Sequence, residues 1–214
     1  MVIRESRCIR CYACVAACEQ GAISQNGGIP ITDREKCVLC GACAEVCYAE
    51  AREIAGREMT VAEVMAEIER DAAFYEESGG GVTFSGGEPL LQGEFLIALL
   101  EACRERGFHT AVDTSGFAPW ETMERVGRLA DLFLYDLKLM DDARHRKYAG
   151  ATNRPILENL QALSKQGREI ILRIPLIPGI NDDEENIRQM GQFAAALPHL
   201  DRVDLLPYHR MGAE

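Results

Sequence analysis

The stretch CIRCYACVAAC (residues 8–18) contains four cysteines, and the stretch CVLCGACAEVC (residues 37–47) repeats them at the same spacing. Both stretches read CxxCxxCxxxC, so the N-terminal part of the chain consists of two equivalent thiol-rich loops. No segment has the apolar length of a signal sequence or a membrane-spanning helix, and we expect a cytoplasmic protein. Because a reducing compartment keeps thiols free, the eight cysteines are interpreted as metal ligands and not as disulfides.

The CxxCxxCxxxC spacing is typical of bacterial ferredoxins, in which three thiolates bind one iron–sulfur cube and the fourth binds the neighbouring cube. This crossing predicts two [4Fe-4S] clusters. One would be held by Cys8, Cys11, Cys14 and Cys47, and the other by Cys37, Cys40, Cys43 and Cys18. The alternative is zinc, but zinc sites usually combine two separated CxxC pairs. Three cysteines at this spacing enclose a cube better than a tetrahedral ion.

The overall composition limits the classes of partner. The chain has 214 residues, of which 47% are apolar, so it can bury a substantial core. Its formal net charge is -11 and its basic residues are scattered, which disfavours both nucleic acid and anionic membranes as partners. We therefore expect a soluble protein with a soluble partner.

After residue 56 cysteine almost disappears, so we assign residues 1–56 to a ferredoxin-like domain and residues 57–214 to an α/β domain. The second domain begins with a capping box of Thr60 and Glu63, and apolar spacing predicts one amphipathic helix over 60–78. Strands and helices then alternate. The predicted strands are 81–85, 109–113, 132–136, 169–175 and 202–208, and the predicted helices are 91–106, 120–129, 154–166 and 184–197. Alternation of this kind predicts a parallel sheet curved into a full or partial (β/α) barrel, although no strand precedes the first helix.

Ligands of such sheets bind at the carboxyl ends of the strands, where polar residues gather in this sequence. The pair Gly86 and Gly87 lets backbone groups approach a ligand closely, and Lys138 suits a carboxylate. Asp113 and Asp136 suit a cation or a ligand hydroxyl, so together these residues predict a site for a zwitterionic ligand. Each motif alone is typical of an ordinary strand end. The histidines at 109, 145 and 199 are interpreted as structural.

Five segments carry a family resemblance: GGGVTFSGGEPLLQ, DTSGF, DLKLMDDARHRKYAG, RIPLIPGIND and LLPYH. In order and spacing they resemble the activating enzymes of glycyl radical enzymes, which are radical S-adenosylmethionine (SAM) proteins, in the subgroup with a ferredoxin-like two-cluster insert. The resemblance implies a partial (β/α)6 barrel and a chemistry in which reductive cleavage of SAM leads to hydrogen abstraction from a glycine of a partner enzyme. It also implies flavodoxin or ferredoxin as the electron donor.

The same resemblance implies roles for individual residues. Contacts to the methionyl amino group of SAM, largely through backbone, fall to Ser85, Gly86, Gly87, Glu88 and Pro89. Asp136, Leu137 and Lys138 are expected at the ribose and carboxylate. Asp113, Thr114 and Asp136 are candidates for a monovalent cation site, His209 for the SAM pocket, and Arg173 for the incoming glycine-bearing peptide. No catalytic residue is assigned.

The sequence departs from the family pattern in one motif. The CxxxCxxC motif, whose cysteines hold the SAM-binding [4Fe-4S] cluster, is absent, because glycine occupies position 21 after Cys18 and glutamate occupies position 50 after Cys47. We expect the chain to be a fragment, with this third cluster only in the full-length protein. Two alternatives stay open, namely an iron–sulfur electron-transfer module without SAM chemistry and a radical SAM enzyme that acts on a small molecule. Which glycyl radical enzyme is the partner is not identified.

Overall fold

A computed structural model of the chain describes residues 1–208. It divides into two compact units, Met1–Met59 and Thr60–Glu214, which are treated separately below. None of the helices in the described part is long and apolar enough to cross a membrane.

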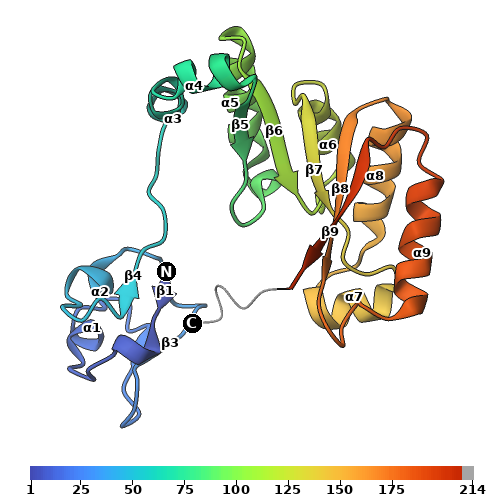
Figure 1. The fold of residues 1–214 in the computed structure, drawn as a ribbon. Helices are drawn as coiled ribbons and strands as arrows, with labels where there is room; N and C mark the ends of the chain where they lie inside the picture. Colours follow the sequence, from blue (N-terminus) through green and yellow to red (C-terminus); the bar gives the residue numbers. More distant parts are fainter. Residues whose placement is uncertain (209–214) are drawn as a thin grey trace. The chain divides into compact units, whose positions relative to one another are not determined.

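The N-terminal unit is formed by two similar halves with little regular structure (Figure 1). A single turn of helix follows the second cysteine of each block, α1 (Ala13–Ala16) in the first and α2 (Ala42–Glu45) in the second. The short strands pair antiparallel, β1 (Val2–Ile3) with β4 (Arg52–Glu53) and β2 (Ile23–Ser24) with β3 (Ile31–Thr32), and a 3-10 turn, η1, covers Glu5–Arg7. The buried cluster of this unit contains Cys14, Ile23 and Cys43. Two of the three members of this cluster are therefore cysteines.

The second unit contains a five-stranded parallel sheet in the order β5-β6-β7-β8-β9 (Figure 1). The strands are β5 (Gly81–Phe84), β6 (His109–Thr114), β7 (Leu132–Asp136), β8 (Glu169–Leu176) and β9 (Arg202–Pro207). Their connections include η2 (Pro89–Gln92), α5 (Gly93–Glu105), α6 (Trp120–Gly127), α7 (Asp142–Ala149), α8 (Arg154–Lys165) and α9 (Glu184–Ala195). The predicted α/β class, a partial parallel barrel with a ferredoxin-like domain, is confirmed.

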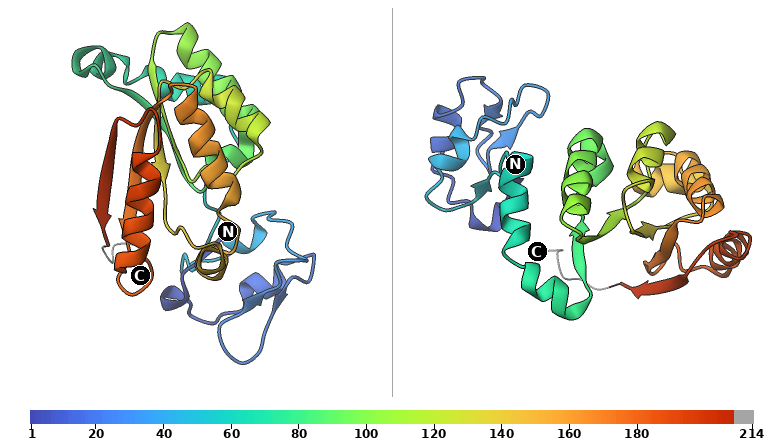
Figure 2. Two further views of the ribbon diagram at one scale, coloured as in Figure 1. Left: turned by 90° about the vertical axis from the view of Figure 1, so that its right-hand side faces the viewer. Right: turned by 90° about the horizontal axis from the view of Figure 1, so that it is seen from above.

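The main helices pack along one face of this sheet (Figure 2). In β7 the side chains of Phe133 and Tyr135 are fully buried in the main core, whereas Leu134 and Asp136 are half-buried. Since side chains alternate along a strand, Asp136 and its registered neighbour Arg173 belong to the face opposite these helices. The alternation thus separates an apolar core from a polar inner face.

The predicted helix over 60–78 is wrong in one respect, because the structure contains two helices there. α3 (Val61–Glu69) begins with the predicted capping box, in which the Thr60 hydroxyl accepts from the Glu63 N–H and the Glu63 carboxylate accepts from the Thr60 N–H. The chain leaves helical geometry at Asp71 (φ -101°, ψ 7°) before α4 (Ala72–Ser78). Aspartate favours such breaks because its short polar side chain competes with helical hydrogen bonding.

Helix α7 was not predicted from the sequence. Its N-cap is Asp141, whose side chain accepts from the Arg144 N–H at 2.7 Å, and its C-cap is Gly150 in the left-handed conformation. Only His145 is buried along it, so the segment lacks the apolar stripe on which the helix predictions depended.

Candidate functional site

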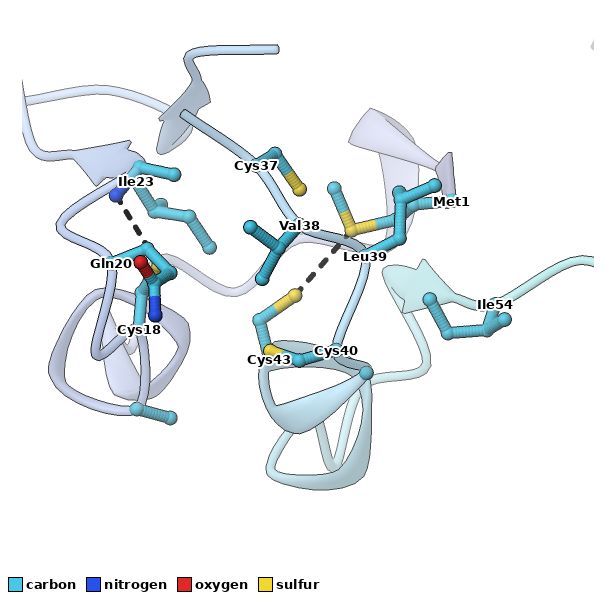
Figure 3. A pocket seen from close by; sticks show the side chains of 13 residues that line it. Met1, Cys18, Gln20, Ile23, Cys37, Val38, Leu39, Cys40, Cys43 and Ile54 are labelled. Carbon is cyan, nitrogen blue, oxygen red and sulfur yellow. Dashed lines mark hydrogen bonds between the residues drawn. The ribbon is translucent and has the colours of Figure 1, made fainter. Parts of the chain in front are cut away.

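The structure gathers the eight clustered cysteines around two pockets of the N-terminal unit. Figure 3 shows the first, of about 360 Å³, with Cys37 and Cys43 pointing toward one another across it. The first pocket is lined by Cys18, Cys37, Cys40 and Cys43, and the second, of about 330 Å³, by Cys8, Cys11, Cys14 and Cys47. Each group combines three cysteines of one block with the last cysteine of the other, which is the grouping that two crossed clusters need.

The walls of these pockets fit an iron–sulfur cluster. All eight thiols are free, and the remaining lining is mostly apolar, with Ile23, Val38 and Ile54 in the first pocket. The N–H of Ala22 donates to Cys18 Sγ at 3.3 Å, a bond of the type that tunes cluster sulfurs. Within residues 1–208, no three His, Cys, Asp or Glu side chains are close enough to hold one metal ion. Four cysteines with mostly apolar neighbours at each pocket match the ligand set of a [4Fe-4S] cluster.

The backbone around the cysteines is strained at matching positions of the two halves. Among the described residues, the non-glycine residues with positive φ all lie here: Arg10, Tyr12, Leu39 and Glu50. Arg10 and Leu39 both precede the second cysteine of their block, with φ of 58° and 56°. Such conformations persist only where the surroundings impose them, and they concentrate at functional sites. Their repetition indicates that both loops are shaped for the same kind of ligand.

A second candidate site lies at the carboxyl ends of the parallel strands. It is a pocket of about 670 Å³ with polar groups from three strand ends and apolar groups beside them. Glu88, Ser115, Asp136 and Lys138 supply the polar lining, and Leu91, Phe117 and Ile156 contribute to the apolar lining. A mixture of a few polar groups and an apolar wall is typical of pockets that bind a cofactor.

Glu88 joins two of the motifs that the sequence singled out. Its carboxylate accepts from the Thr114 hydroxyl at 2.6 Å, from the Ser115 N–H at 2.9 Å and from the Ser115 hydroxyl at 2.5 Å. It also accepts from the N–H of Leu90 at 3.3 Å, at the start of η2. Hydrogen bonds to a charged acceptor are the stronger kind, so Glu88 fixes the SGGEP turn against the end of β6.

Arg173 links two carboxylates on the inner face. Its guanidinium donates to Asp136 Oδ1 at 3.0 and 2.9 Å and also to Asp113, and Lys138 Nζ lies 3.7 Å from Asp136 Oδ2. Although burial acts to lower it, the carboxylates of Asp136 and Asp113 raise the pKa of Arg173 overall, so this side chain stays charged. Asp113, Thr114 and Asp136 do not converge on one point here, because Thr114 turns to Glu88. Their role as a cation site stays a prediction.

The remaining predicted residues are placed as follows. Gly86 has a φ of 129° and, like Gly87, has open space where a side chain would lie. Ser85 is exposed at the end of β5, and Pro89 is the first residue of η2. Leu137 is buried in the core, and its N–H donates to the Arg173 carbonyl, so only its backbone belongs to the strand end. His209 lies outside the described residues.

His145 was interpreted as structural, and the structure adds a second aspect. The residue is 4% exposed, and its ring lies within hydrogen-bonding distance of a backbone carbonyl, with 2.7 Å between Nδ1 and the oxygen of Ala151. It also lines the pocket at the strand ends. The sequence carried no signal for this position, since α7 itself was not expected.

Comparisons with known proteins identify both units. Residues 35–191 match the radical SAM superfamily, and residues 7–51 match the 4Fe-4S dicluster domain. The trans-4-hydroxy-L-proline dehydratase activating enzyme of Clostridioides difficile is 44% identical over 99% of this chain and 71% of the relative. The isethionate sulfite-lyase activating enzyme of Desulfovibrio desulfuricans is 41% identical over 97% of this chain and 69% of the relative.

A solved structure agrees with this assignment. A domain of pyruvate-formate lyase-activating enzyme from Bacteroides vulgatus superposes with a TM-score of 0.58 and is 46% identical, covering 62% of this chain and 83% of that domain. The chain therefore belongs to the glycyl radical enzyme activating enzymes of the radical SAM superfamily, and it carries their 4Fe-4S dicluster domain.

Proposed function

We propose that this chain serves the activation of a glycyl radical enzyme, with two [4Fe-4S] clusters in its N-terminal unit and SAM bound at the strand ends of its second unit. The observation that carries the proposal is the crossed grouping of the eight cysteines around two pockets. When bound, iron–sulfur clusters would supply the electron that cleaves SAM into methionine and a 5′-deoxyadenosyl radical, and this nucleoside radical would take a hydrogen atom from a glycine of the partner.

The residues of the second pocket divide the binding of SAM among them. Lys138 offers a point charge to the methionyl carboxylate, and Asp136 offers acceptor oxygens to the ribose hydroxyls. The two glycines after β5 leave backbone groups accessible to the methionyl ammonium, and the Glu88 network holds that turn in place. Phe117 and Leu91 line the same pocket and offer apolar surface to the ligand.

The third cluster of the family has no ligands in this sequence. The motif CxxxCxxC is absent from the 214 residues, and the eight clustered cysteines are already grouped around the two pockets. We therefore derive no step through a third cluster. The proposed roles of this chain are electron supply by the N-terminal unit, with flavodoxin or ferredoxin as the donor in a reducing cytoplasm, and SAM binding by the barrel.

Binding of SAM tests the proposal directly. The chain would be reconstituted anaerobically with iron and sulfide, and its affinity for radiolabelled SAM would be measured by equilibrium dialysis. Loss of a charge-assisted hydrogen bond worth about 1.5–3 kcal/mol predicts that Lys138→Ala weakens binding about tenfold or more. The matched control is Lys165→Ala, which removes an exposed lysine at the end of α8 and should leave the affinity unchanged.

The alternatives give different results in the same preparation. A protein that holds two clusters but does not bind SAM would be an electron-transfer module, and the proposal would be wrong. Cleavage of SAM coupled to turnover of a small molecule, without a protein substrate, would identify the other kind of radical SAM enzyme. Formation of a glycyl radical in an added partner enzyme, observed by EPR spectroscopy, would support activation.

A further inference from the structure

Arg52, in β4, is a buried charge in the N-terminal unit. Its relative exposure is 5%, and no other Asp, Glu, Lys or Arg of the described residues is buried to this degree. Nη1 donates to the hydroxyl of Thr32 at 2.7 Å, and Nη2 donates to the carbonyl of Pro30 at 2.8 Å. These contacts hold the guanidinium in one place.

None of the described groups that Arg52 contacts is a carboxylate: they are the Thr32 hydroxyl, the Pro30 carbonyl and the sulfur atoms of Met1 and Cys43. Among the described residues, no carboxylate forms an ion pair with this side chain. A buried charge without a counter-charge is costly, because the surroundings do not replace the water that solvated it. Its burial is therefore explained best by an anionic group that the protein chain itself does not supply.

The position of Arg52 points to that group. Arg52 and Pro30 both line the pocket of Cys8, Cys11, Cys14 and Cys47. Nη1 also lies 4.0 Å from Met1 Sδ, which is 3.4 Å from Sγ of Cys43, a lining residue of the other pocket. The guanidinium thus contacts wall residues of both pockets.

The two halves of the unit differ at this position. Cys18 and Cys47 occupy equivalent places in their blocks, and in that register Ile23 corresponds to Arg52. Ile23 is likewise buried and lines the first pocket, as Arg52 lines the second. The positive charge is therefore an addition to one half and not part of the repeated motif.

We propose that Arg52 is the counter-charge of the two iron–sulfur clusters and raises their reduction potentials; the proposal rests on the two-cluster assignment above. A cluster with four thiolate ligands is an anion, and it becomes more negative when it accepts one electron from an external donor. A fixed positive charge in a poorly solvated site stabilises the reduced form more than the oxidised form. Arg52 would thereby ease the entry of electrons.

The test is an EPR-monitored redox titration of the reconstituted chain, with dithionite as reductant. Arg52→Gln should lower the reduction potential of at least one cluster, and Arg52→Lys, which keeps the charge, should stay near the wild-type value. Arg10→Gln is the matched control, because Arg10 lines the same pocket but is exposed, so water screens its charge. Arg10→Gln should therefore lower the reduction potential less than Arg52→Gln does.

Iron and sulfide content, measured first, separates this proposal from the assignment of the clusters. A wild-type chain without two cubes contradicts the assignment itself. Fully loaded Arg52→Gln protein with unchanged potentials overturns the role of Arg52 alone. If the glutamine variant does not retain clusters, Arg52→Lys decides: loading restored by lysine supports a counter-charge, and failure of both variants shows that only the shape of the arginine matters.

Discussion

Gly116, in the DTSGF motif, illustrates at the residue scale how closely the strand ends are packed. It has a φ of 74°, and a Cβ placed there would lie 1.7 Å from the hydroxyl oxygen of Tyr135. That hydroxyl is buried and donates to the Ile156 carbonyl at 2.7 Å, while the Gly116 carbonyl accepts from Asn159. Neither neighbour can move without losing a buried hydrogen bond.

Substitution of Gly116 by alanine should therefore be severely destabilising. Gly179 has the same φ of 74° but open space around it, so Gly179→Ala isolates the backbone strain, which costs about 1 kcal/mol. We expect Gly116→Ala to lower the free energy of unfolding by at least about 2 kcal/mol more than Gly179→Ala does, because it also overpacks the core. Urea denaturation followed by circular dichroism measures both. If the two substitutions lowered the free energy of unfolding equally, the Tyr135 side chain would have moved aside at little cost.

Helix α3 shows at the element scale what local sequence determines. Its capping box satisfies two backbone N–H groups through side chains three residues apart, and it could be recognised without any tertiary contact. α7 is the opposite case, since its cap, Asp141, precedes a charged segment with a single buried residue. Its Asp142 accepts from Thr152, Arg146 and the Asn153 N–H, and these bonds lower the pKa of that carboxyl to about 2.

Loss of the α3 cap gives a measurable prediction. Thr60→Ala removes the acceptor for the Glu63 N–H and should reduce the free energy of unfolding by about 1 kcal/mol. Thr60→Ser keeps a hydroxyl at the same place and serves as the control, with stability close to wild type. Chemical denaturation of the two variants side by side measures the difference. A serine variant as unstable as the alanine variant would show that the threonine methyl group, not the hydroxyl, is important.

The two units differ at the scale of the whole molecule in what stabilises them. The barrel has a large apolar core, whose fully buried side chains include Leu100, Phe133, Tyr135 and Leu172. The buried cluster of the N-terminal unit contains only Cys14, Ile23 and Cys43. A unit of this size with so small a core generally depends on its bound metal for stability.

Removal of the clusters should consequently affect the two units unequally. After oxidative loss of iron from the full chain, peptides from residues 1–59 should lose protection against hydrogen exchange. Peptides from β6, β7 and β8 should keep theirs, because their core contains no metal ligand. Hydrogen–deuterium exchange with mass spectrometry measures both at once. Undiminished protection in residues 1–59 would mean that the backbone of this unit is stable without clusters.

Elements with local signals could be predicted from the amino-acid sequence. The spacing of eight cysteines, the capping box at Thr60 and the alternation of five strands with helices each depend on residues close together in the chain. The predicted fold class and family are accordingly confirmed. The helix break at Asp71 was missed because the apolar spacing continues across it, and α7 was missed because it has no apolar stripe.

The contacts between distant side chains became known from the three-dimensional structure. The bonds from Thr114 and Ser115 to Glu88, the position of Arg173 between Asp113 and Asp136, and the place of His145 in the pocket join segments far apart in the sequence. The burial of Arg52 without a carboxylate partner belongs to the same class. Such contacts depend on strand register and packing, and a periodic pattern carries no information about them.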